Sequence, residues 1–239
     1  MNSPCPICHS ATVPHDVIDL NASCDDRNGK VFPLAFVPIY YHLCPSCGHY
    51  FAPQMLSWSH EDFKTKIYNS DYPLVDPDCT GQRAENNAEA ILGFLDGRQV
   101  THLDYGGGNG RLSSILAEAG LDSTSYDPFY GQARPDKTFD AITAFEVFEH
   151  VPNPHSMLAG LLRMAHDDSM ILFSTLLSDG NISPNGRLSW WYAAPRNGHI
   201  SLFSSSSLKA LGKANGLNLI SFSDGMHGFY KNMPSWFPA

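Results

Sequence analysis

Hydrophobic and polar positions follow two different periods along the central part of the chain. Apolar residues recur at helical spacing over Arg83–Leu95 and Arg111–Ala119, which predicts helices with one buried face. Between and after these segments lie short unbroken apolar runs, typical of strands buried on both faces of a parallel sheet. The alternation of the two patterns predicts an α/β fold. The other expected elements are strands near Val100, over 139–147 and over 169–177, helices over 153–165 and 205–215, and a hairpin of 217–223 with 228–230.

A cluster of glycines joins the strand near Val100 to the helix at Arg111. A strand, a glycine turn and a helix together let the backbone approach a ligand at a helix N-terminus. A second short strand ends at Asp127, 17 residues after Gly110. At the carboxyl edge of a parallel sheet, such a carboxylate can accept hydrogen bonds from the hydroxyls of a ribose.

The spacing of the glycines argues against a dinucleotide. In a G-x-G-x-x-G fingerprint starting at Gly106, the third glycine would fall on Arg111. Asp104, just before the turn, would repel a pyrophosphate but suits an ammonium group. A ligand with a ribose, a cationic amino-acid end and no phosphate points to S-adenosylmethionine (SAM), and an NAD-dependent dehydrogenase is disfavoured.

Three stretches resemble class I SAM-dependent methyltransferases: LDYGGGNGRL, SYDPF and FDAITAFEVFEHVPNP. The resemblance implies a Rossmann-like sheet of the seven-stranded methyltransferase type. Only Pro128–Thr138 separate the second strand from the next one, so the third strand should be shortened or absent. A glycine-rich turn with no ligand is the structural alternative. The residues expected to bind SAM are Asp104, Tyr105, Gly106, Gly108, Gly110, Asp127, Pro128, Phe129, Phe145 and, from the preceding segment, Tyr72.

Two C-P-x-C knuckles near the start of the chain predict a metal site. Their thiolates, from Cys5, Cys8, Cys44 and Cys47, form the donor set of a tetrahedral structural Zn²⁺ in a small zinc ribbon. The spacing between the knuckles is unusually long, so the segment from Ala22 to Ile39 must loop out. Rival ligands are Cys24, His9 and His49. Six cysteines without an evident leader favour metal ligation in a reducing, cytoplasmic setting over disulfides.

Charge limits the range of partners. The formal net charge is −9, and through residue 52 two basic residues face four acidic ones, so a nucleic-acid partner is not expected. No apolar run has membrane-spanning length, so no membrane association is expected. The chain then divides into a zinc ribbon (1–52), a connecting segment or lid (53–82) and a methyltransferase domain (83–239) that acts on a small-molecule acceptor. Oligomeric state stays open.

The acceptor side is expected where the segment GHISLFS meets the sheet. The segment resembles E-H-x-S-Y-F-S of zinc-containing sugar C-methyltransferases and G-T-H-D-W of quinone-pathway O-methyltransferases. The resemblance makes His199 the candidate general base, with Glu146, His150 and Arg196 lining the acceptor. Gly198 and Leu202 depart from the sugar-enzyme pattern.

Structural and functional alternatives remain open on this side. His199 would otherwise only hydrogen-bond its own loop. Glu149 and His150 would cap the loop before Asn153, or bind a divalent cation as nearby acids and a histidine do in some O-methyltransferases. Other readings of the whole chain are an RNA or protein methyltransferase that uses the ribbon as a reader, and a non-catalytic SAM- or zinc-binding module.

Overall fold

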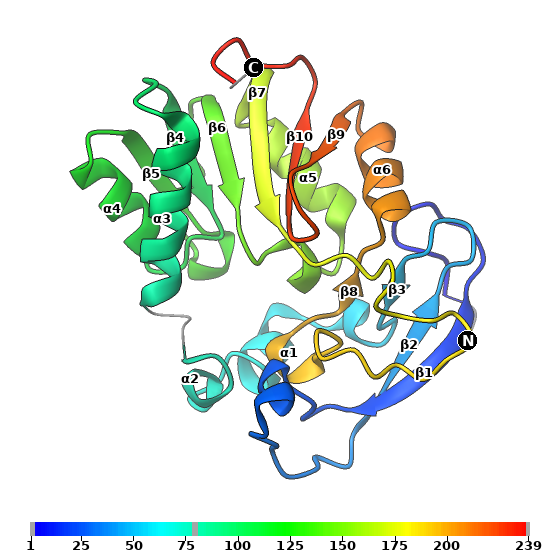
Figure 1. Cartoon of the computed structure of the whole chain (residues 1–239). Helices are drawn as coiled ribbons and strands as arrows, with labels where there is room; N and C mark the ends of the chain where they lie inside the picture. Colours follow the sequence, from blue (N-terminus) through cyan, green and yellow to red (C-terminus); the bar gives the residue numbers. More distant parts are fainter. Residues whose placement is uncertain (1–2, 78–80, 238–239) are drawn as a thin grey trace.

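The computed structural model describes residues 3–77 and 81–237. Its centre is a six-stranded sheet in the order β5-β4-β6-β7-β10-β9 (Figure 1). Strands β5, β4, β6 and β7 are parallel, and β10 pairs antiparallel with both β7 and β9. The strands are β4 (Thr101–Tyr105), β5 (Asp122–Tyr126), β6 (Phe139–Ala144), β7 (Ala165–Ser174), β9 (Asn218–Ser221) and β10 (Met226–Tyr230).

Two helices cover each face of this sheet. Figure 1 shows α3 (Gln82–Leu95) and α4 (Arg111–Glu118) on one side. On the other side lie α5 (Pro154–Leu162) and α6 (Ser205–Ala214). The fully buried Leu116 belongs to the core under α4, and Leu158 and Leu208 belong to the core under α5 and α6. The architecture is the predicted Rossmann-like sheet between two helical layers.

The third strand usual in this type of sheet is absent from the described residues between β5 and β6, in line with the prediction that it is shortened or absent. Between β5 and β6 the chain forms only a single 3-10 turn, η4 (Pro128–Tyr130), and irregular structure. The predicted strand over 139–147 ends early, at Ala144, because Glu146 adopts a positive φ of 53° and turns the chain out of the sheet. The predicted strand over 169–177 is displaced: β7 runs from Ala165 to Ser174, because Ala165 already pairs with Phe139 of β6 before an irregularity in the register that ends at Met170.

The N-terminal residues build a second sheet, in the order β1-β2-β3-β8. Its strands are β1 (Val13–Asp19), β2 (Pro38–Leu43), β3 (Tyr50–Phe51) and β8 (Ser201–Leu202). The last strand comes from the C-terminal half of the chain, where Leu202 pairs with Tyr50. The segment between β1 and β2 loops out as expected and contains the short helix η1 (Cys24–Asn28). This second sheet therefore shares a strand with the segment that carries His199.

The connecting segment consists of short helices below the sheet in Figure 1: η2 (Met55–Ser57), α1 (His60–Lys66) and α2 (Tyr72–Val75). At the other end of the chain, the ring of Phe237 lies 5.4 Å from that of Phe94 on α3. Within the described part of the chain, no helix has both the length and the apolar character needed to cross a membrane.

Candidate active site

The glycine turn follows β4 and leads directly into α4. Gly106, Gly108 and Gly110 all have positive φ, between 56° and 77°, a region that side-chain-bearing residues rarely occupy. Gly107 is required for a different reason: a Cβ there would lie 2.2 Å from Asp104 Oδ2 and 2.6 Å from Ser125 Oγ. The turn is thus built so that only backbone faces a ligand at the start of α4.

Asp104 lies beneath this turn and is 3% exposed. Its Oδ1 accepts a 3.4 Å hydrogen bond from Thr143, while Oδ2 has no partner among the described residues. Burial raises the pKa of this carboxyl to about 7, and the charge of Asp127 adds to the shift. The side chain supports the turn from below, and its predicted contact with a ligand stays a prediction.

Asp127 ends β5 beside the turn, where the sequence placed it. Its Oδ2 accepts a hydrogen bond from Gly108 N at 3.0 Å, and its Oδ1 accepts one from Phe129 N at 2.7 Å. Each carboxylate oxygen can accept more than one hydrogen bond, so the group is oriented by backbone and can still accept from a ribose. Tyr105 ends β4, and Pro128 starts the turn that carries Phe129.

Aromatic rings from the connecting segment cover this end of the sheet. Phe129 stacks on His60 of α1, with ring centroids 3.8 Å apart. Tyr68 meets Phe129 edge-on at 5.3 Å and Tyr72 at 5.0 Å. The Tyr68 hydroxyl lies 3.2 Å from His150 Nδ1. Tyr68 therefore joins the glycine-turn side of the site to the histidine side.

Glu146 occupies the point where the chain leaves β6. Its positive φ is unusual for a side-chain-bearing residue, and such strain is often found at functional sites. Ser174 secures the bend, since its hydroxyl accepts from Glu146 N at 2.8 Å and donates to Glu146 Oε1 at 2.9 Å. Phe145, the residue before it, packs against the core under α3 and α4.

Glu149, His150 and His199 come together although His199 is distant from the other two in sequence. One donor atom from each lies within 4.8 Å of the others. Burial raises the pKa of Glu149 and lowers the pKa of both histidines. The nearby charge of Glu146 raises the pKa of Glu149 further. Near neutral pH the cluster therefore favours neutral imidazoles.

His199 is held with one ring nitrogen engaged. Its Nδ1 lies 2.8 Å from the carbonyl oxygen of Tyr192; a carbonyl only accepts, so Nδ1 carries the proton and Nε2 keeps its lone pair. The Tyr41 hydroxyl donates to the His199 carbonyl at 2.5 Å. Cys24 Sγ is 4.0 Å from Nδ1, so Cys24 lies at this site and outside the cluster of four thiols. The Tyr192 and Tyr41 contacts set the orientation that a base requires.

The loop before His199 forms a wall of the site. The guanidinium of Arg27 in η1 lies 3.6 Å from the centre of the Trp191 ring. Arg196 is buried and donates to the carbonyl of Ile67 at 2.7 Å and to Asn69 Oδ1 at 3.0 Å. Arg196 thus ties the loop to the end of α1, and its predicted role beside the acceptor gains no support from these contacts.

The two knuckles meet as predicted. Cys5 Sγ and Cys47 Sγ are 3.7 Å apart, and Cys8 Sγ and Cys44 Sγ are 3.5 Å apart. Four sulfurs at Zn–S distances of about 2.3 Å in a tetrahedron would lie about 3.8 Å apart, so the donor set fits zinc. The rival ligand His49 is instead buried beside Phe203, at a ring distance of 4.8 Å.

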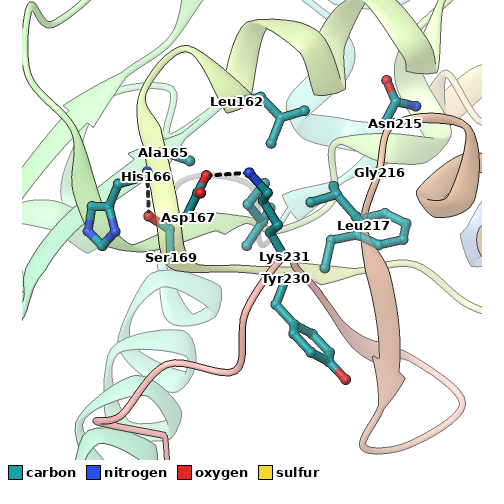
Figure 2. A pocket seen from close by; sticks show the side chains of 12 residues that line it. Leu162, Ala165, His166, Asp167, Ser169, Asn215, Gly216, Leu217, Tyr230 and Lys231 are labelled. Atoms are coloured by element: carbon teal, nitrogen blue, oxygen red, sulfur yellow. Dashed lines mark hydrogen bonds and ion pairs between the residues drawn. The ribbon is translucent and has the colours of Figure 1, made fainter.

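A separate hollow of about 400 Å³ lies at the opposite edge of the sheet, where β7 starts. Figure 2 shows its lining, with Lys231 paired to Asp167 at 2.7 Å and the Ser169 hydroxyl bonded to His166 N. The carboxyl ends of the parallel strands, where ligands of such sheets bind, lie at the other edge. We therefore place the active site at the glycine turn.

Sequence reasoning missed two tyrosines of the site. They are Tyr192, in the loop before His199, and Tyr41 of β2. Both touch His199 through backbone carbonyls, a contact that leaves no mark in the local sequence.

Comparison with known proteins agrees with this geometry. Residues 79–221 match the methyltransferase domain family. A ubiquinone biosynthesis O-methyltransferase of Photobacterium profundum is 33% identical over 85 residues, which are 34% of this chain and 36% of that protein. Its counterpart in Bordetella avium is 29% identical over 114 residues, covering 37% and 46%. The matches span less than half of these relatives' length.

Among solved structures, the 1,6-didemethyltoxoflavin-N1-methyltransferase of Burkholderia thailandensis shares the fold. The similarity covers 83% of this chain and 96% of that one, with a TM-score of 0.50 and 16% identity. That structure holds 1,6-didemethyltoxoflavin and S-adenosylhomocysteine. Because the family match spans more than half of the chain, the chain belongs to the methyltransferase domain family, and its resemblance to class I SAM-dependent methyltransferases is confirmed.

Proposed function

We propose that the chain transfers a methyl group from SAM to a small-molecule acceptor, most simply to a hydroxyl oxygen. The observation that carries the proposal is the buried His199 ring, across Tyr68 from the glycine turn: its Nδ1 faces the Tyr192 carbonyl, and its Nε2 has no hydrogen-bond partner in the described part of the chain. The similarity to ubiquinone biosynthesis O-methyltransferases favours oxygen over carbon as the acceptor atom.

Different residues of the chain act on the methyl donor and on the acceptor. Bound SAM supplies a methyl group on a positively charged sulfur. The turn at Gly106, Gly108 and Gly110 admits the nucleoside, and Asp127 accepts from its ribose hydroxyls. His199 Nε2 takes the acceptor proton as the acceptor oxygen bonds to the methyl carbon and the carbon–sulfur bond breaks, leaving a neutral thioether. The enclosing rings exclude water and align the two reactants.

Screening tests this proposal directly. The zinc-loaded chain is incubated with methyl-tritiated SAM and a panel of small phenols, catechols and sugars, and labelled products are counted. His199→Gln should lower the transfer rate by about 100-fold or more while S-adenosylhomocysteine still binds. His166→Gln, at the far edge of the sheet, is the matched control and should behave as wild type. Full activity of the His199 variant would remove this base from the mechanism.

We also propose a structural Zn²⁺ on Cys5, Cys8, Cys44 and Cys47. The close approach of four thiols with no disulfide between them supports it. Cys47 O accepts a hydrogen bond from Ser204 Oγ, the cap of α6, at 2.6 Å. Zinc would therefore stabilise the start of α6 and the strand just before it.

A divalent cation at Glu149, His150 and His199 is a second candidate role for the cluster. The donor set of one carboxylate and two imidazoles supports it. The two roles differ in their dependence on metal. Magnesium, manganese or zinc restoring activity after chelation would favour the cation, whereas transfer that survives chelation with the Cys₄ zinc retained would favour the base.

The alternative interpretation, in which the N-terminal unit recognises an RNA or protein substrate, makes a separate prediction. Affinity for RNA that falls steeply with salt would favour it. Salt-insensitive binding of a small acceptor would argue against it.

A further inference from the structure

We infer that Tyr192 is a positioning residue that keeps Glu149 from capturing the free nitrogen of His199. The inference rests on the proposed role of His199 and adds the reason why its Nε2 stays available. Tyr192 is 3% exposed and touches both partners, one with its side chain and the other with its backbone.

The side chain of Tyr192 engages the carboxyl group. Its hydroxyl donates a hydrogen bond to Glu149 Oε1. Glu149 is fully buried, and its other oxygen, Oε2, has no hydrogen-bond partner within the described ranges 3–77 and 81–237. A buried carboxyl group that lacks donors carries a large penalty. Without the tyrosine hydroxyl, Glu149 would need another donor.

The backbone of Tyr192 engages the imidazole. Its carbonyl oxygen accepts from His199 Nδ1 at 2.8 Å and from Ala194 N at 2.9 Å. The tyrosine ring also lies against the imidazole, with centroids 4.2 Å apart. These contacts select the tautomer with the proton on Nδ1 and the lone pair on Nε2.

His199 is an alternative donor for Glu149, because the two groups lie within the same 4.8 Å cluster. The competing donors are His150 of that cluster and the buried hydroxyl of Thr175, which has no hydrogen-bond partner among the described residues. If the tyrosine hydroxyl is removed, the carboxyl group can accept from Nε2–H, and the proton moves from Nδ1 to Nε2. The imidazole then loses the lone pair that a base needs. The two contacts of Tyr192 thus act together on the tautomer of one ring.

Nitrogen-15 NMR of the histidine rings tests this in the full, zinc-loaded chain without added divalent cations, with S-adenosylhomocysteine as the probe ligand. The His199 signals are assigned by their loss in His199→Gln. We expect wild type to show almost only the Nδ1–H tautomer. Tyr192→Phe should raise the Nε2–H share at least fivefold, while Tyr50→Phe, another buried tyrosine, should leave the tautomer unchanged.

Rescue separates positioning from a general structural role. In the double variant Tyr192→Phe with Glu149→Gln, the amide oxygen competes far less well for Nε2–H than a carboxylate does, so the Nδ1–H tautomer should return. A Tyr192→Phe spectrum identical to wild type, or a double variant that stays shifted, would overturn the inference. If Tyr192→Phe does not fold, Glu149→Gln alone serves: it should keep the Nδ1–H tautomer, and a shift to Nε2–H would overturn the inference.

The affinity for S-adenosylhomocysteine distinguishes failure of this inference from failure of the proposed function. Its affinity should change less than twofold in Tyr192→Phe. Failure of wild type to bind it would contradict the proposed function, whereas the tautomer result would still decide the role of Tyr192.

Discussion

The two halves of the active site are built in different ways. The cofactor half comes from one continuous stretch, from β4 through the glycine turn to Asp127 and Phe129. The acceptor half is assembled from segments far apart in the chain: Cys24, Tyr41 and Glu149 meet the loop that carries His199, and Tyr68 meets His150. The first half can be recognised by spacing alone, while the second exists only after the chain has folded.

The N-terminal unit packs against the acceptor half of the site and is not set apart as a separate recognition module. Ala52 N donates to the carbonyl of Ile200 at 2.9 Å, and the residues just before Ala52 and just after Ile200 pair as β3 and β8. Tyr41 holds the carbonyl of His199. Cys5, Cys44 and Cys47 pack into the same core as the central sheet. Disruption of the two cysteine knuckles should therefore disturb the position of His199 more than the conformation of the glycine turn.

The largest expected effect follows removal of one zinc thiolate. Cys47→Ser should lower the zinc content from about one per chain to near zero and lower the melting temperature strongly, since a structural zinc site contributes on the order of 10 kcal/mol. Atomic absorption and thermal unfolding measure this. Cys24→Ser, outside the four-thiol cluster, should keep its zinc. Full zinc content in the Cys47 variant would refute the proposed ligand set.

A smaller effect is expected from Asp104, and it depends on pH. Its carboxyl has a pKa of about 7 in the folded chain and an ordinary value of 3.8. Below 3.8 the group is protonated in both states and has no effect. Between 3.8 and about 7 only the unfolded state ionises, so stability falls as pH rises, by about 4 kcal/mol at most.

Asp104→Asn removes this cost. Chemical denaturation should therefore show the variant gaining stability relative to wild type as pH rises from 4 to 8. A stability difference that does not change with pH would contradict the buried, raised-pKa environment. Because Asp104 lies under the glycine turn, the zinc content should not change.

A substitution in the glycine turn should have a smaller effect, confined to the cofactor half of the site. Gly107→Ala places a Cβ against Asp104 and Ser125, and such overpacking costs about 1–3 kcal/mol. Calorimetry should show weaker S-adenosylhomocysteine binding, by about tenfold or more, with the His199 tautomer intact. Gly93→Ala in α3 meets nothing within 4 Å and is the control. Equal binding by both variants would show that the turn tolerates a side chain.

Periodicity and glycine spacing were enough to predict the sheet, its missing third strand and the position of Asp127 next to the turn. They failed at strand ends, because the bend at Glu146 depends on its bonds to Ser174, 28 residues later. The four cysteines were predicted because two matching knuckles are a local signal. The contacts of Tyr192 and Tyr41 and the pairing of β3 with β8 were not predicted. They join segments that are separated by 43 residues or more.

Calorimetric titration with S-adenosylhomocysteine of wild type, Asp127→Ala and His199→Gln tests most directly the division of the site into two halves. Removing Asp127 should weaken binding by about tenfold or more, because the carboxylate holds Gly108 N and, in the proposed function, also accepts from the ribose. Removing the imidazole of His199 should change the affinity less than twofold. No binding by wild type, or an affinity lost with His199 and kept without Asp127, would contradict the account.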